Sequence, residues 1–168
     1  ISELYSLGIE PVMVTGDNQS AAGAVASQVG IKHFVAGVLP GGKVDEIKRL
    51  RGEYGVVAMV GDGINDAPAL TEADIGFAIG SGSDIALESG DIVLSRGGIA
   101  SIPSAVRLSR ATMRKIKQNL FWAFFYNTAG IPLAAFGLLS PVIAGACMAL
   151  SSVSVVTNSL LLKRTKLK

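Results

Sequence analysis

The sequence predicts a parallel α/β domain followed by a transmembrane helical hairpin, and three observations indicate this. Short apolar runs alternate with helical segments in the first part of the chain, a pattern typical of a parallel sheet with flanking helices. Residues 1–91 hold all 13 acidic residues and 5 basic ones, whereas residues 92–168 hold 10 basic residues and no acidic one. Residues 119–162 form a stretch of 44 without a charged side chain. A wholly soluble protein is therefore excluded, and the 49% hydrophobic content excludes a disordered chain.

The elements of the first part follow from local patterns. The run 55–60 is continuously apolar, as expected of a strand that is buried on both faces. Residues 18–29 have an Ala-rich helical composition and are followed by Gly30, a common helix end. Helical spacing of apolar residues predicts a second helix over 40–50. The expected strands are 11–15, 55–60, 75–79 and 92–94, and the expected helices are 18–29, 40–50 and 67–73.

Two polar clusters follow predicted strands, at the positions where parallel sheets bind ligands. Thr15-Gly16-Asp17 follows the first strand, and the segment 61–66 follows the central one. In that segment Asp62 and Asp66 lie four residues apart. Two neighbouring carboxylates are costly unless a cation lies between them, and their hard oxygens suit Mg²⁺. The pattern therefore indicates a magnesium site at the strand ends.

Neighbouring residues favour phosphoryl transfer at the same place. The Thr15 hydroxyl can bond a phosphoryl oxygen, and the Lys43 ammonium can neutralise its charge. Gly61 and Gly63 would let the backbone pass close to a ligand. Taken singly, each of these features is more often a turn, a helix cap or a solvated lysine. Their order on a parallel-sheet pattern favours a site where catalysis is mostly positioning and charge neutralisation.

Three motifs resemble those of the P-type ATPases. The segment 61–70, with the sequence GDGINDAPAL, resembles the hinge signature of that family. Val14-Thr15-Gly16-Asp17-Asn18 resembles the family's Thr-Gly-Asp motif, and Lys43 resembles its phosphate-site lysine. The three occur in the family's order, and the resemblance covers essentially the whole chain. It implies a partial haloacid-dehalogenase-like domain, with a parallel sheet and flanking helices, that would belong to a phosphorylation domain.

The resemblance also implies a role for each motif residue. Asp62 would bind Mg²⁺ with support from Asp66; Thr15, Asn65 and Lys43 would hold the phosphoryl group; and Gly16 and Asp17 complete the catalytic Thr-Gly-Asp motif. The family phosphorylates an aspartate in an Asp-Lys-Thr-Gly-Thr motif, which does not occur in the sequence. We therefore expect the carboxy-terminal portion of a pump, inactive alone, with ATP as a substrate bound mainly by another domain.

Residues 98–118 are predicted to form an amphipathic linker helix after the soluble part, residues 1–97. Arg107, Arg110, Arg114 and Lys117 recur at three- or four-residue spacing, so they share one helix face. Next to an apolar block, this face fits the anionic lipid of an inner leaflet. A solvated helix would show the same spacing. No aromatic residue interleaves the basic ones, so we expect no nucleic-acid partner.

Residues 119–168 are predicted to form two transmembrane helices and a basic cytoplasmic tail. The segments 120–139 and 142–162 are each long enough to cross about 30 Å of hydrocarbon. Basic residues flank the pair at both ends and are absent from the turn between them, so the positive-inside rule places both ends in the cytoplasm. We expect a multi-pass integral membrane protein of the cell membrane, with its soluble part and C-terminus cytoplasmic.

Polar residues within the predicted spans point to a transported ion. Tyr126 and Asn127 in the first span, with Met148 and Ser152 in the second, resemble the last two helices of copper-transporting P-type ATPases. By this resemblance the four side chains line the path of Cu⁺ or Ag⁺, for which a thioether is a soft ligand. Helix packing alone would otherwise explain them. Cys147 lies about 100° around the helix from Met148, and we expect it to pack.

The leading hypothesis is part of a heavy-metal P-type ATPase that pumps Cu⁺ or Ag⁺ through an aspartyl-phosphate intermediate. Its expected partners are membrane lipid, the amino-terminal portion of the pump and a copper chaperone. A truncated, non-catalytic membrane module that binds metal or phosphate is the second hypothesis. The third is a haloacid-dehalogenase-like phosphatase, but such an enzyme would not need two charge-free spans.

Overall fold

The computed structural model describes residues 1–39, 41–80, 84–95, 97–137 and 140–164. The chain has two compact units, Ile1–Pro103 and Ser104–Lys168. Three predictions fall partly outside the described residues: the helix start at Pro40, the span end at 138–139 and the basic tail at 165–168.

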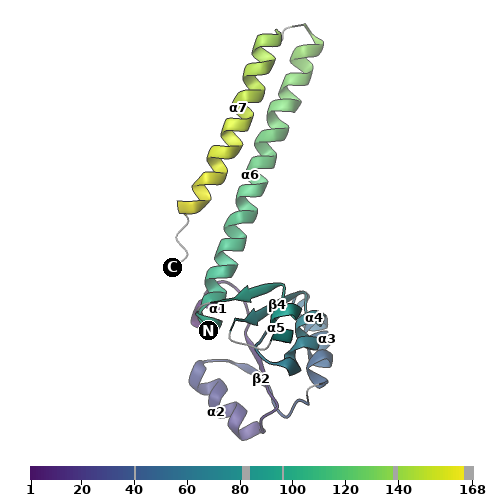
Figure 1. Ribbon diagram of the computed structural model, residues 1–168, viewed down its shortest axis with the longest axis vertical. Coiled ribbons are helices and arrows are strands. Elements are labelled where there is room, and N and C mark those ends of the chain that lie inside the picture. The colour runs from purple at the N-terminus through teal and green to yellow at the C-terminus, as the bar shows by residue number, and fades with distance from the viewer. Residues whose placement is uncertain (40, 81–83, 96, 138–139, 165–168) are drawn as a thin grey trace. The chain divides into compact units, whose positions relative to one another are not determined.

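The first sheet consists of β1 (Val12–Val14) and β2 (His33–Val35), which pair in parallel. Helix α1 (Ser2–Ser6) precedes β1, and α2 (Gln19–Val29) connects the two strands (Figure 1). Strand β1 confirms the prediction for residues 11–15. Strand β2 was not predicted, because three residues carry too little periodicity to stand out.

Helix α2 has the ends that its sequence predicts. The side chain of Asn18 accepts a hydrogen bond from the N–H of Ala21 at 2.9 Å, which satisfies one donor of the first turn. Gly30 ends the helix in the left-handed region, with φ of 77°. Ala22 and Ala26 are its buried residues.

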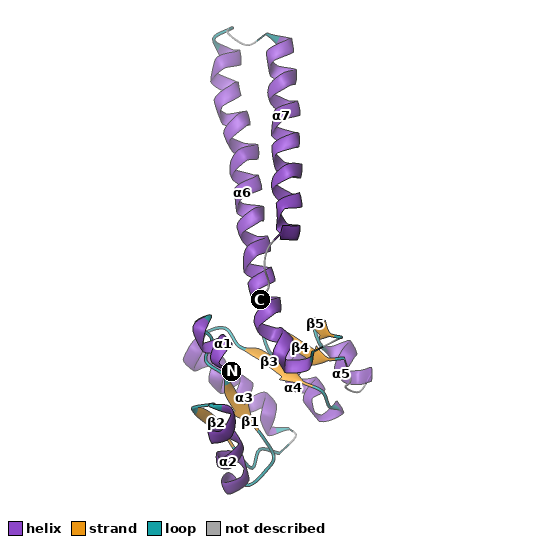
Figure 2. Ribbon diagram, turned by 90° about the vertical axis from the view of Figure 1, so that its left-hand side faces the viewer, coloured by secondary structure: helices purple, strands orange, loops and turns teal. Residues whose placement is uncertain are grey.

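The second sheet contains β3 (Ala58–Gly61), β4 (Ile75–Ile79) and β5 (Ile92–Leu94), all parallel and in that order (Figure 2). Strands β4 and β5 have the predicted bounds. The connecting helices are α3 (Gly42–Tyr54), the short η1 (Ile64–Asp66), α4 (Ala67–Glu72) and α5 (Asp84–Ser89). Helix α3 extends four residues beyond the predicted end at residue 50, and α5 was not predicted.

The prediction that the run 55–60 is buried on both faces was wrong. Val56 is 73% exposed, Ala58 is exposed, and Met59 and Val60 are only half-buried. The physical reason is the pairing: β3 bonds β4 on one side, and β1 bonds β2 on one side, so the described strands form two parallel sheets instead of one.

Helix α3 and the start of β4 are joined by charged side chains. Arg51 pairs with Glu72 at 2.9 Å and with Asp74 at 3.2 Å. The N–H of Val57 also donates to Asp74 at 2.8 Å. The hydrogen bond from Val57 and then the Arg51 guanidinium hold the pKa of Asp74 below its usual range.

The second unit is a helical hairpin. It begins within α6 (Ile102–Ala135), which follows the short η2 (Gly98–Ser101), and continues with α7 (Pro141–Leu160) and η3 (Leu161–Arg164). The predicted linker and first span are one continuous helix, because no helix-breaking residue separates them. That helix ends at Ala135 and not at residue 139, because the N–H of Gly137, with φ of 69°, closes the last turn onto Ala134 O at 3.0 Å.

The described residues contain one helix that is long and apolar enough to cross a membrane. It covers Ala144–Lys163, 20 residues with a mean hydropathy of 1.6. The part of the predicted first span that α6 covers, residues 120–135, is helical as predicted. It would span about 24 Å at 1.5 Å per residue.

Close backbone packing in the second sheet gives the first prediction. A methyl group at Gly76 would lie 2.8 Å from the carbonyl oxygen of Leu70, whereas one at Gly52 in α3 would meet nothing within 4 Å. We expect Gly76→Ala to lower the free energy of unfolding by about 1–3 kcal/mol. Gly52→Ala should instead raise it by about 0.5–1 kcal/mol, because Ala restricts the unfolded chain. Amide hydrogen exchange of Phe77 and Ala78 measures the free energy of unfolding of both variants. Equal changes in that free energy would contradict the packing argument.

Candidate phosphoryl-transfer and ion-transport sites

The Thr-Gly-Asp motif forms a tight turn at the carboxyl end of β1. The N–H of Thr15 donates to Val35 O at 2.9 Å, which extends the pairing of β1 with β2. The Thr15 hydroxyl donates to Asp17 Oδ2 at 3.0 Å, and the Asp17 N–H donates back to Thr15 Oγ1 at 3.2 Å. A side chain on Gly16 would lie 3.4 Å from Val38 O. The turn therefore holds the hydroxyl at the strand end.

Asp66 is the one polar side chain of the buried set among the described residues, with 9% of its surface exposed. Its Oδ1 accepts a hydrogen bond from the ammonium of Lys43 at 2.6 Å. Its Oδ2 lies 3.3 Å from the N–H of Gly63. A buried carboxylate needs such partners because it has lost water. Asp66 thus fixes the Lys43 side chain at the end of β3.

Gly61 has a different role from the predicted approach to a ligand. A Cβ at Gly61 would lie 2.6 Å from the Cβ of Asp66. The missing side chain therefore makes room for Asp66. Gly63 is less constrained, since a Cβ there would meet Asp66 at an ordinary 3.6 Å.

Asp62 and Asn65 are the exposed polar residues of the same segment. No group of three His, Cys, Asp or Glu side chains gathers as a metal site in the part of the chain that the structure describes. Mg²⁺ does not need such a group, because it commonly takes one or two carboxylates and completes its shell with water and phosphate oxygens. The exposed carboxylate of Asp62, four residues before Asp66 in the chain, fits this donor set.

The loop after β2 bridges the two sheets. The N–H of Val38 donates to Thr15 O at 3.0 Å, and Gly42, at the start of α3, donates to Leu39 O at 2.9 Å. The next residue, Lys43, reaches Asp66. Val38 therefore contacts the end of β1, and Lys43, five residues later, contacts Asp66 beyond the end of β3. The predicted phosphoryl-site motifs belong to one connected region.

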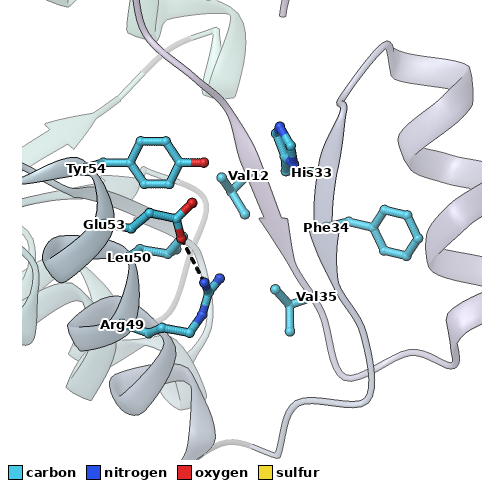
Figure 3. A pocket seen from close by; sticks show the side chains of 8 residues that line it. All are labelled: Val12, His33, Phe34, Val35, Arg49, Leu50, Glu53 and Tyr54. Atoms are coloured by element: carbon cyan, nitrogen blue, oxygen red, sulfur yellow. Dashed lines mark hydrogen bonds and ion pairs between the residues drawn. The ribbon is translucent and has the colours of Figure 1, made fainter.

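A separate hollow lies between the first sheet and α3 (Figure 3). Its charged lining residues are already paired, since Arg49 bonds Glu46 and Glu53. The hydrogen bond that the Tyr54 hydroxyl donates to Glu53 raises the pKa of Tyr54. None of the predicted site residues belongs to its lining, which consists of Val12, His33, Phe34, Val35, Arg49, Leu50, Glu53 and Tyr54.

The helical hairpin has a seam of half-buried residues. On α6 they are Asn119, Ala123, Tyr126 and Gly130; on α7 they are Ala144, Cys147, Ser151, Ser154, Val155 and Asn158. Both sets follow the three- and four-residue steps of a helix–helix contact, and their small members allow close approach. The position of Cys147 in this seam agrees with the expected packing role.

The predicted transport residues divide between the seam and the outer surface. Tyr126 lies on the seam, whereas Asn127 and Ser152 are exposed and Met148 is 71% exposed. The Asn127 amide donates to Ala123 O at 2.7 Å. The Ser152 hydroxyl donates to Met148 O at 3.2 Å. Each bond runs along a single helix, and the exposed thioether of Met148 stays available to a ligand outside the hairpin.

Sequence reasoning missed the polar contacts between α6 and α7. Lys115 bonds Asn158, and Asn119 bonds both Asn158 and Ser159. One signal was available: Asn119 precedes Tyr126 by seven residues, so the two share a helix face.

Comparison with known proteins shows which proteins the chain resembles. A family model described as "Hydrolase: haloacid dehalogenase-like hydrolase" matches residues 1–74. The chain is 58% identical over 99% of its length to a copper-exporting P-type ATPase of Staphylococcus saprophyticus, and 56% identical over its whole length to one of Staphylococcus aureus. It covers 21% of each of these relatives.

A solved structure extends the likeness to the fold. The crystal structure of a zinc-transporting PIB-type ATPase in its E2.Pi state superposes with a TM-score of 0.89 and 40% identity. The match covers 96% of this chain and 26% of that one. Together with the apolar helix α7, these relatives show a membrane protein with a haloacid-dehalogenase-like domain. By sequence and fold the chain is similar to the P-type ATPases, and it spans about one fifth of the length of the curated relatives it matches.

Proposed function

We propose that the chain forms the phosphoryl-binding and ion-pathway parts of an ATP-driven pump that moves Cu⁺ across a membrane. The observation that carries the proposal is a pair of contacts: the N–H of Val38 bonds Thr15 O, and Lys43, five residues later, pairs with Asp66. It gathers a hydroxyl, an ammonium and two carboxylates in one connected region. Such a set suits a reaction that depends on positioning and charge neutralisation.

The residues of this region have distinct chemical roles. The Lys43 ammonium and the Thr15 hydroxyl bind phosphoryl oxygens, and Asn65 offers an amide from the exposed side of η1. Asp62 and Asp66 would hold Mg²⁺, which when bound neutralises charge on the phosphoryl oxygens. Asp66 also keeps the Lys43 side chain in place before phosphate arrives. This pairing means that the ammonium need not be reoriented during the reaction.

The phosphorylated aspartate is supplied by another segment of the pump. In the proposed step its carboxylate attacks the γ-phosphorus of ATP, the bond to the leaving oxygen breaks, and ADP departs. Within the described residues, β1 and β3 each have one paired side, and their side chains are only partly buried. A strand that enters between β1 and β3 would join the two sheets and carry the aspartate to Thr15 and Lys43.

The transported ion is assigned from the membrane part. Residues 119–162 contain no acidic side chain, and the exposed thioether of Met148 is a soft ligand suited to Cu⁺ or Ag⁺. The curated relatives are named copper-exporting, whereas the solved neighbour is zinc-transporting. The higher identity of the former, 58% against 40%, agrees with the ligand chemistry.

The basic residues set the proposed orientation in the membrane. The predicted spans have positive flanks at both ends, so two crossings place the C-terminus and the first unit in the cytoplasm. The basic face of α6 would contact anionic lipid of the cell membrane. A copper chaperone as the donor of the ion stays a prediction.

The copper assignment is tested at Met148. In the full-length protein that contains this chain, Met148→Leu keeps the side-chain volume but removes the sulfur, so Cu⁺-stimulated ATP hydrolysis should fall about tenfold or more. Met113→Leu, at an exposed methionine of α6 outside the spans, is the matched control. Equal activity of the two variants would contradict the role of Met148. A native enzyme that responds to Zn²⁺ and not to Cu⁺ or Ag⁺ would contradict the metal.

The phosphoryl site is tested at Lys43. Lys43→Met removes the charge that pairs with Asp66, so binding of orthovanadate by the full-length protein should weaken about 10- to 100-fold, as expected for a hydrogen bond to a charged group. Lys48→Met changes an exposed lysine of the same helix and should leave binding unchanged. Similar vanadate affinity in the two variants would place the phosphate elsewhere.

Strand insertion is tested by hydrogen exchange. The amides of Val12–Val14 and Ala58–Val60 should exchange about tenfold or more slowly in the full-length protein than in the 168-residue chain, because an added strand would protect them. Strand β4 is paired on both sides and serves as the internal control. Unchanged exchange in both β1 and β3 would exclude an added strand between them.

A further inference from the structure

A chain of hydrogen bonds joins α6 to α7 at one end of the hairpin, where the two helices lie side by side (Figure 2). We call Lys115, Asn119, Asn158 and Ser159 the interhelical polar cluster. The Lys115 ammonium donates to Asn158 Oδ1 at 2.7 Å. The Asn158 amide donates to Asn119 Oδ1 at 2.8 Å, and the Asn119 amide donates to Ser159 Oγ at 2.8 Å.

The hydrogen bonds of the interhelical polar cluster form one continuous chain, in which each bond runs from donor to acceptor in the same direction. Each asparagine accepts through its oxygen and donates through its nitrogen, and the Ser159 hydroxyl passes the chain on to Val155 O at 2.8 Å. Lys115, Asn119 and Asn158 are half-buried. Sliding one helix along the other would break all three interhelical bonds together, and near lipid the freed groups would have few alternative partners.

The cluster also fixes which residues of the seam face one another. Seven residues beyond Asn119 on α6 is Tyr126, and seven residues before Asn158 on α7 is Ser151. Seven residues are about two helical turns, so antiparallel helices that meet at Asn119 and Asn158 also meet at Tyr126 and Ser151. Burial agrees, because both residues are half-buried.

We propose that the interhelical polar cluster locks the register of α6 against α7 and thereby sets the geometry of the ion pathway. Asn127 follows Tyr126, and Met148 and Ser152 flank the Ser151 turn, so a slip of one turn would move the two pairs apart by about 5.4 Å. Lys115, Asn119, Asn158 and Ser159 are then positioning residues, which act through the predicted transport residues. The effect on ion transport rests on the proposed function. The fixed register of α6 against α7 does not.

Cysteine cross-linking tests the lock without any transport. In the 168-residue chain in lipid vesicles, with Cys147→Ala, the pair Ala123→Cys and Ser154→Cys reports the native register, because both positions lie on the seam. The pair Ala123→Cys and Ser151→Cys reports a slip of about one turn. We expect Asn158→Leu to lower the ratio of native to slipped disulfide about three- to tenfold, the range for losing interhelical hydrogen bonds in lipid.

Thr157→Leu is the matched control, since Thr157 is the exposed neighbour of Asn158. It should leave the cross-linking ratio unchanged. Asn158→Asp gives a second, milder variant: its carboxylate still accepts from Lys115 but cannot donate to Asn119, so the ratio should fall between native and Asn158→Leu. A ratio that is the same in native and both Asn158 variants would overturn the lock.

The positioning role has its own readout in the full-length protein. Asn158→Leu should raise the Cu⁺ concentration for half-maximal ATPase activity about three- to tenfold while leaving the KM for ATP unchanged, and Asn158→Asp should partly restore it. A changed cross-linking ratio without any change in Cu⁺ dependence would overturn the positioning role and keep the lock. If the native protein shows no Cu⁺-stimulated activity, the proposed function fails, while the cross-linking result still decides the lock.

Discussion

Charged contacts along helix α3 hold the soluble unit together. Near its start Lys43 pairs with the buried Asp66, and near its end Arg51 pairs with Glu72 and Asp74. The helix follows the first sheet in the chain and bonds the residues that flank the second. Two sheets with few fully buried side chains would otherwise share little apolar contact. The same Lys43–Asp66 pair that connects the sheets also prepares the phosphoryl site, so fold and chemistry depend on one interaction.

The sides of β1 and β3 that pair with no described strand are related to the proposed chemistry, because a strand that pairs with both would carry the phosphorylated aspartate. Strands β1 and β3 carry the motif residues at their carboxyl ends, yet each is paired on one side within the described residues. Thr15 and Asp66 are connected through the loop after β2, so the binding groups are arranged without the strand between them. A phosphorylated aspartate on an inserted strand would then meet groups that are already oriented, which reduces the reorganisation that catalysis requires.

In the proposed pump, the hairpin would separate helix packing from ion binding. Small and polar residues form the seam, while Met148, Asn127 and Ser152 lie exposed on the helices. A soft cation that meets Met148 would therefore lie outside the seam, where other membrane helices can add ligands. Because the hydrogen bonds of Lys115, Asn119 and Asn158 define the register, the packing face determines where the exposed face is presented. Helix packing and ligand access can thus be met on different faces of the same helix.

The sequence by itself determined the parallel α/β class, the bounds of β4 and β5, the caps of α2 and the motif residues, because these depend on local periodicity and on residue chemistry. It also predicted that Cys147 packs, from the angle between neighbouring residues on a helix. The tertiary structure decided the pairing of Lys43 with Asp66, the steric need for Gly61, the exposure of β3 and the bonds from Lys115 and Asn119 to α7. The side-chain contacts join residues more than 20 positions apart, the exposure of β3 depends on which strands find partners, and the need for Gly61 depends on where the Asp66 side chain lies. Local patterns carry no record of any of these.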